Sequence, residues 1–233
     1  MTALVGSIVN SGLLAAASTA TITTGSTTAG NTLVVWGWHE GITTAYTSIT
    51  VTDGGNTWTN SPSQNTDNLR SQMSACAFAL ASGGARTITI TFNGGTGGAD
   101  GEYFAGEFSG GLSAFDQNGS TKAFTASPVT STAGGADSGT DNLVVAAIGC
   151  GSGAANEAFS NPCTGGAAWT SAGINNNDAS SSAGQASYRI NAISTTDAAT
   201  WSFAAGALVG GASASVWSIK TSGANTLIGQ AVL

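Results

Sequence analysis

Much of the central part of this chain occurs twice in the sequence. Three short motifs recur in the same order, displaced by 110 or 111 positions: residues 30–35 at 140–145, residues 58–59 at 169–170, and residues 87–92 at 198–203. Recurrence at nearly one spacing indicates an internal duplication, so each copy should form the same structural unit. We place the two repeats at about residues 30–110 and 140–220, between an apolar N-terminal segment and an apolar tail.

The repeats are patterned as β-strands. Residues 47–52 and 87–92 alternate between polar and apolar side chains, whereas residues 33–38 form a short apolar run that is typical of a buried strand. Turn-forming residues follow these strands and predict hairpins: Asp53-Gly54-Gly55-Asn56, Gly83-Gly84, and the glycines of residues 94–98.

Each repeat supplies four or five strands with one apolar face, which a lone sheet cannot bury. We therefore predict an all-β fold, a two-sheet antiparallel β-sandwich in which residues 1–233 form a single domain. The residues expected in its shared core are Leu33, Val35, Ile88, Ile90, Leu143, Val145 and Trp201. The alternative is two small tandem sandwiches, each completed by its flanking strands. Residues 111–139 should connect the repeats with one or two short strands.

The composition limits the partners of the chain. Charged residues are only 7% of it, against about 25% in an average soluble protein, so hydroxyls, amides and backbone must coat the surface. The net charge is −7 and the five Lys and Arg residues are scattered, which argues against nucleic acid and against an anionic membrane. The apolar N-terminal residues lack the basic start of a secretory signal, so we expect the chain to fold where it is made.

The residues that hydrolytic enzymes use are missing or misplaced. The chain has one histidine and neither an HExxH nor a GxSxG motif. Glu102 and Glu107 lie five residues apart on one expected strand, so they should face opposite sides of a sheet and cannot act as a pair. We expect no catalytic residue, no cofactor and no enzymatic activity.

One cluster has the composition of a binding site. Trp36 and Trp38 are separated by one residue and should share a face, next to His39. Because aromatic rings bind sugars, these three residues are the candidate ligand-binding site, although core tryptophans at a strand end give the same pattern. Residues 53–56 could donate oxygens to calcium, but their spacing fits a turn better than a calcium loop.

The cysteines indicate neither a disulfide framework nor a metal site. Cys76, Cys150 and Cys163 are too far apart in sequence for a close metal pair, and we expect small buried thiols. Cys150 and Cys163 flank one loop and are the pair that an exported protein could bridge. We expect no metal, since His39 is far from the cysteines and structural zinc takes four ligands.

The motifs resemble those of a loosely defined group of β-sandwich proteins found among bacteriophage virion genes and in some bacterial surface proteins. The matching segments are residues 30–35, 53–59, 87–92 and 107–110 in the first half, and residues 143–145, 166–170, 188–190 and 212–220 in the second. The resemblance covers most of the chain. It implies a jelly-roll-like or lectin-like sandwich used as a displayed structural or adhesive part, with no catalytic residues.

These observations lead us to expect a bacteriophage virion protein, either a capsid decoration or head-surface protein or a tail component. It would assemble in the host cytoplasm, bind the major capsid protein and form a homo-oligomer such as a trimer. Residues 224–233 would pack against a neighbouring subunit or add an edge strand. The alternative is a carbohydrate-binding or adhesive module that uses Trp36, Trp38 and His39, or the loop ends, to hold a glycan.

Overall fold

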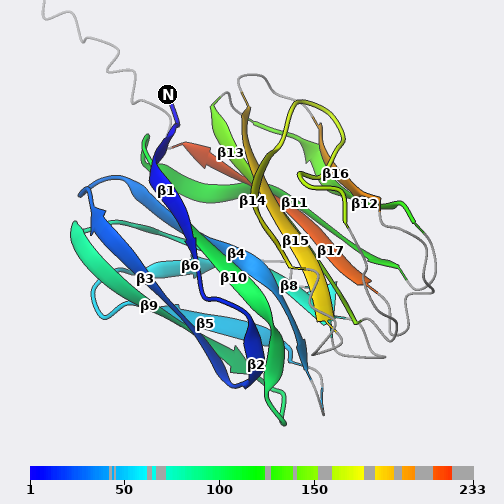
Figure 1. The fold of residues 1–233 in the computed structure, drawn as a ribbon. Coiled ribbons are helices and arrows are strands. Elements are labelled where there is room, and N and C mark those ends of the chain that lie inside the picture. Colours follow the sequence, from blue (N-terminus) through cyan, green and yellow to red (C-terminus); the bar gives the residue numbers. More distant parts are fainter. Residues whose placement is uncertain are drawn as a thin grey trace, which may run out of the picture.

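The computed structural model describes residues 1–41, 44, 46–61, 65–66, 72–123, 127–138, 141–151, 159–175, 182–191, 196–202 and 212–221. Every regular element within these residues is a β-strand, and the paired strands are antiparallel, so the predicted all-β class is confirmed (Figure 1). No helix in this part of the chain could cross a membrane. Residues 224–233, which we expected to contact a neighbouring subunit or to add an edge strand, lie outside the described residues.

The first half forms two sheets. The first large sheet has the order β1 (Leu4–Asn10), β10 (Ala99–Phe108), β4 (Thr32–Gly41), β8 (Gln72–Leu80) and β6 (Trp58–Asn60). Two short strands join it, β2 (Leu14–Ala17) beside β10 and β7 (Asn65–Thr66) beside β8. The first small sheet has the order β3 (Thr19–Thr27), β9 (Gly84–Asn93) and β5 (Ser48–Thr52).

The second half repeats this plan. The second large sheet has the order β11 (Leu112–Ala123), β17 (Ala212–Thr221), β13 (Asn142–Gly151), β15 (Ser182–Asn191) and β14 (Thr170–Asn175). The second small sheet pairs β12 (Val129–Ala136) with β16 (Thr196–Trp201). The two large sheets therefore have the same strand order: β1, β10, β4, β8 and β6 of the first correspond to β11, β17, β13, β15 and β14 of the second. The connector also differs from the prediction, because β11 has 12 residues and is not short.

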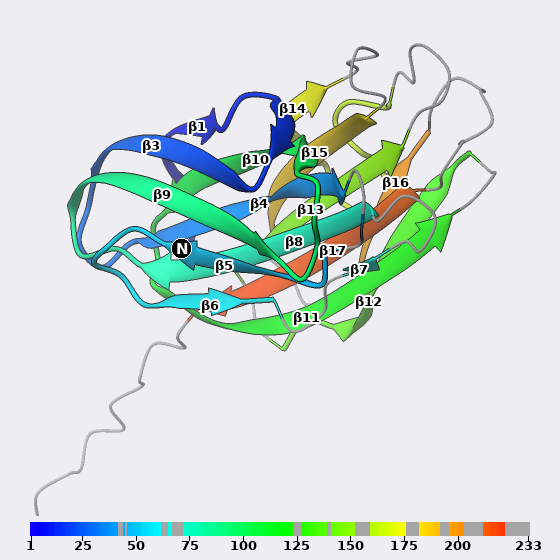
Figure 2. The same cartoon turned by 90° about the horizontal axis from the view of Figure 1, so that it is seen from below.

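The two large sheets pack face to face in the middle of the molecule. Strand β4 lies against β13, β8 against β17, and β10 against β15. In the strand order, β8 corresponds to β15, and β10 corresponds to β17. The contact of β8 with β17 is therefore the counterpart of the contact of β15 with β10, as expected for two halves related by a two-fold axis. The small sheets lie on the two outer sides (Figures 1 and 2).

The prediction of two sheets around one shared core is wrong, because the four sheets enclose three apolar clusters. Val35, Ile88 and Ile90 lie in the cluster inside the first half, and Trp201 lies in the cluster inside the second. Leu143 and Val145 belong to a third cluster, which fills the interface between the large sheets. The arrangement is nearer to the alternative of two small sandwiches, joined here by a further core.

The reason for this error lies in the middle strands. All ten residues of β4 and all ten of β10 are buried, so both faces of the first large sheet are covered. A strand that is buried on both faces has a continuous apolar run instead of an alternating one, and residues 33–38 are such a run. The pattern predicted a buried strand correctly, but we counted only one covered face.

The predicted hairpins are also wrong, because each of these turns leads the chain from one sheet to the other. Residues 53–56 connect β5 in the small sheet to β6 in the large one, Gly83-Gly84 connects β8 to β9, and residues 94–98 connect β9 to β10. Gly54 and Gly83 do have the positive φ angles of such turns, +74° and +89°. Turn residues specify that the chain reverses, whereas burial of apolar faces decides which sheet receives the next strand.

The burial of β4 and β13 favours a displacement of 111 between the two halves over the displacement of 110 between residues 30–35 and 140–145. Val34 and Val145 both face the interface between the halves, whereas Val35 faces the core of the first half. A displacement of 110 would pair Val35 with Val145 and so pair opposite faces, because neighbouring residues of a strand alternate. The displacement that preserves the faces is 111, which pairs Val34 with Val145 and Asn31 with Asn142.

Candidate functional site

The aromatic residues predicted to bind a ligand are buried. Trp36 is 0% exposed and Trp38 is 1% exposed, and both lie in the cluster between the two large sheets. The ring of Trp36 packs near Phe104, Phe108 and Tyr188. The two tryptophans share a face, as predicted, but that face is covered by the other half of the molecule. A sugar ring cannot reach them, so they do not form a glycan platform.

His39 faces the opposite side of the sheet and is also buried. Its Nδ1 lies 2.7 Å from the hydroxyl oxygen of Tyr103, and its ring packs against Tyr46 and Phe92. Burial lowers the pKa of His39 from 6.5 to about 3, so the imidazole is neutral near pH 7. His39 is therefore a core residue and is not accessible to a ligand.

The turn at residues 53–56 uses its carboxylate internally. Asp53 Oδ1 accepts hydrogen bonds from the backbone N–H groups of Gly55 (3.1 Å) and Asn56 (2.8 Å), and Oδ2 accepts one from the Asn56 amide (2.5 Å). Partial burial raises the pKa of Asp53, but these hydrogen bonds outweigh it and lower the pKa overall. The described residues contain no group of three His, Cys, Asp or Glu that could hold a metal ion.

The three cysteines are buried thiols. Burial raises the pKa of Cys76 well above its ordinary value and that of Cys163 to about 12. Cys150 and Cys163, the pair that an exported protein could bridge, are both thiols here, and both side chains belong to the core of the second half.

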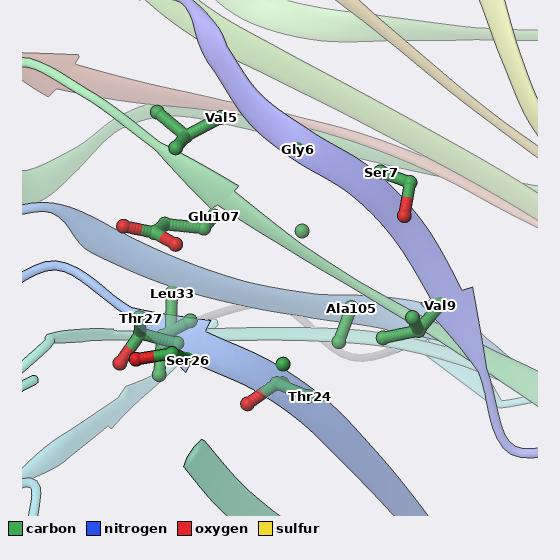
Figure 3. A pocket seen from close by; sticks show the side chains of 12 residues that line it. Val5, Gly6, Ser7, Val9, Thr24, Ser26, Thr27, Leu33, Ala105 and Glu107 are labelled. Carbon is green, nitrogen blue, oxygen red and sulfur yellow. The ribbon is translucent and has the colours of Figure 1, made fainter. Parts of the chain in front are cut away.

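A cleft opens at the edge of the first half, between β1 and β3, and the sequence did not predict it (Figure 3). Its volume is about 200 Å³, and its lining is mostly apolar, with hydroxyl groups along β3. The residues that define it are Val5 and Val9 of β1, Thr24 and Thr27 of β3, Leu33 of β4, and Ala105 and Glu107 of β10.

Irregular pairing in β1 and β3 accompanies the cleft. The partners along β1 jump from Val5 opposite Glu107 to Val9 opposite Ala105, so three residues of β1 face Gly106 alone. Strand β3 shifts its register between Thr23 and Ser26 in the same way. A bulge bends its strand locally, and both irregular stretches, residues 5–9 and 23–26, lie beside the cleft.

Glu107 is the one charged residue that lines the cleft. Its side chain is 9% exposed, and Oε1 accepts hydrogen bonds from the Thr28 N–H at 2.8 Å and from the Asn31 amide at 2.5 Å. No described residue donates to Oε2 or forms an ion pair with the carboxylate. The side chain lies between Val5 and Leu33 (Figure 3). The sequence placed Glu107 in the motif of residues 107–110 and excluded it from a catalytic pair with Glu102, but did not predict it in a binding site.

The corresponding place in the second half is closed. Ser218 occupies the position of Glu107, because it is opposite Val144 as Glu107 is opposite Leu33. Asn142, the counterpart of Asn31, donates to Ser218 Oγ at 3.1 Å. Strand β11 lies directly on β12 there, since a Cβ added at Gly119 would overlap the carbonyl oxygen of Thr132. The two halves share a strand order, but the described residues of β11 and β12 are in contact where the first half has its cleft.

Comparison of the chain with protein-family models, with curated proteins and with solved structures finds no match.

Proposed function

We propose that this protein is a non-enzymatic component of a bacteriophage virion, displayed as a capsid decoration or head-surface protein or as part of the tail. One observation carries the proposal. None of the Asp, Glu, Lys or Arg side chains for which the structure gives exposure is fully exposed. The charge-poor exterior suits attachment, because charged residues are depleted in the buried centres of protein interfaces.

The outer face of the first small sheet shows this most clearly. Threonines stand side by side across its three strands: Thr21 is opposite Thr89 and Thr89 opposite Thr52, while Thr19 is opposite Thr91 and Thr91 opposite Thr50. Cross-strand threonine pairs stabilise a sheet and leave hydroxyl and methyl groups on its surface. Such a face can contact a partner without the cost of desolvating ions.

We also propose that the two halves are copies of one jelly-roll-like unit, produced by duplication. The common strand order and the two-fold packing of the large sheets support this. Trp58 packs on the core of the first half, and its counterpart Trp169 lies in the core of the second. Asn31 and Asn142 likewise donate to corresponding positions of β10 and β17.

The proposal is tested on purified particles from cells that produce the protein. We expect it to copurify in a fixed ratio to the major capsid protein through density-gradient centrifugation, and to form an oligomer such as a trimer in light scattering. Turnover of any substrate by the purified protein would overturn the non-enzymatic assignment. Absence from the particles would overturn the virion assignment.

The second candidate function is an adhesive module for a neutral glycan, and the threonine face favours it. Since Trp36, Trp38 and His39 are buried, this site would lie on the outer face of β3, β9 and β5. If a glycan bound there, Thr21→Lys would abolish retention on a glycan array, whereas Thr130→Lys, on an exposed position of the second half, would not. Equal retention of both variants would remove this candidate.

A further inference from the structure

We propose that the cleft between β1 and β3 binds the side chain of a lysine on a partner protein. The ammonium group would meet Glu107 Oε2, and the aliphatic stem would lie along Val5, Leu33 and Ala105. This inference rests on the proposed function, because it identifies the chemistry by which the protein would attach to its neighbour in the virion.

The first argument concerns charge. Glu107 is nine-tenths buried, yet no described cation pairs with it and only one of its oxygens accepts hydrogen bonds. Oε2 is not among the described polar atoms that are buried without a partner, so it reaches the cleft. Because most of the residue is buried, a cation that meets Oε2 would be screened by less water than at an exposed acid. The existing hydrogen bonds hold the carboxylate in place and reduce the entropy lost on binding.

In the first half, Glu107 holds the loop at Thr28 and Asn31 with one carboxylate oxygen. The second half shows that a carboxylate can hold such a loop with both of its oxygens. There Asp116 secures the equivalent loop and uses both oxygens, accepting from Ser138 N–H (2.5 Å) and Asn142 (3.0 Å) at Oδ2 and from the Ser138 hydroxyl (2.6 Å) at Oδ1. The charge of Lys220 also helps to lower the pKa of Asp116. Among the described residues, Glu107 therefore has an acceptor that no donor uses and a charge that no cation offsets, and its structural role explains neither.

The size and lining of the cleft select the ligand. A cavity of about 150 Å³ holds one benzene molecule. The cleft, at about 200 Å³, is therefore large enough for one side chain but too small for a peptide segment. The apolar walls suit a methylene stem. One free carboxylate oxygen suits the point charge of lysine, whereas the planar guanidinium of arginine is matched by two.

The three cations whose side chains the structure describes, Arg86, Arg189 and Lys220, are held by groups of their own chain. Arg86 donates to the Ser82 hydroxyl and to the Gly83 carbonyl, and Arg189 is buried against Asp197. Lys220 is half-buried beside Asp116. None of the three is free to enter the cleft of a second copy.

The test is an NMR titration of the full chain with Nα-acetyl-lysine methylamide, and with Nα-acetyl-norleucine methylamide as the neutral probe. We expect saturable shifts of the Val5, Leu33 and Ala105 methyl signals with the lysine probe and binding roughly tenfold or more weaker with norleucine. Glu107→Gln should weaken lysine binding to the same degree, because an amide still accepts from Thr28 and Asn31 but carries no charge. Glu102→Gln, on the other face of β10, should bind as the unaltered chain does.

A second variant keeps the carboxylate and fills the cleft. Gly25 lines the cleft, and a Cβ added there meets no atom within 4 Å, so Gly25→Leu should fold normally and lose the lysine-dependent shifts. Equal binding of both probes, undiminished binding by Glu107→Gln or Gly25→Leu, or no saturable shift would overturn the lysine site. If the shifts are absent but the protein copurifies with particles, the lysine site fails and the virion function stands. If the lysine-dependent shifts are present but the protein does not copurify with particles, only the virion function is overturned.

Discussion

The indole of Trp38, in the first half, lies directly on the backbone of Gly184, in the second half. A Cβ added at Gly184 would overlap Cε2 of the indole, and one added at Gly149 would stand 2.5 Å from Cδ1. Strands β13 and β15 thus leave a slot for a single large ring from β4. The contact explains why two glycines are required on the second half of the interface.

We predict that Gly184→Ala destabilises the protein by roughly 1–3 kcal/mol, because the methyl group forces the indole or a strand to move in a packed core. Gly184 has no positive φ angle, so the loss would come from the contact and not from backbone strain. Denaturant unfolding measures the change, and Gly25→Ala is the control, with an expected change of at most about 0.5 kcal/mol. Equal stabilities of the two variants would show that Trp38 does not occupy this slot.

Glu102 should make the stability fall as the pH rises. Burial raises its pKa from 4.5 to about 7, so the folded protein retains a proton that the unfolded chain has already released. The contribution to stability is complete below about pH 4.5 and is lost as the pH rises through about 7. Relative to Glu102→Gln, the unaltered protein should lose roughly 1–3 kcal/mol over this range in chemical denaturation. Parallel pH profiles of the two proteins would refute the prediction.

His39 should have the opposite effect at lower pH. Its pKa is lowered from 6.5 to about 3, so the unfolded chain takes up a proton that the folded protein excludes. This contribution is complete above about pH 6.5 and decreases as the pH falls towards 3, by roughly 3 kcal/mol at about pH 4. His39→Gln should flatten the acid limb of the profile. An NMR titration that protonates His39 near pH 6.5 in the folded state would contradict this.

The thiols should be unreactive in the native protein. Burial disfavours the thiolates of Cys76 and Cys163, which are the forms that attack Ellman's reagent. We expect almost no reaction before denaturation and three thiols per chain afterwards, without a reductant. A single thiol after denaturation would mean that two cysteines are bridged.

The sequence predicted most of the strands, because alternation at residues 87–92 and the apolar run at residues 33–38 are local properties. It did not predict which sheet each strand joins, since Gly54 and Gly83 permit a turn equally well within a sheet or between sheets. Trp36 and Trp38 were correctly placed on one face, but exposure depends on the other half of the molecule. The cleft depends on bulges in β1 and β3 and on four segments distant in sequence, so no local pattern marks Glu107 as part of a site.

The most direct test of the virion function uses particles that lack the protein, to which the purified, labelled chain is added back. We predict saturable binding at a fixed number of copies per particle. Binding that does not saturate, or no binding at all, would contradict the proposal that this protein is a structural part of the virion.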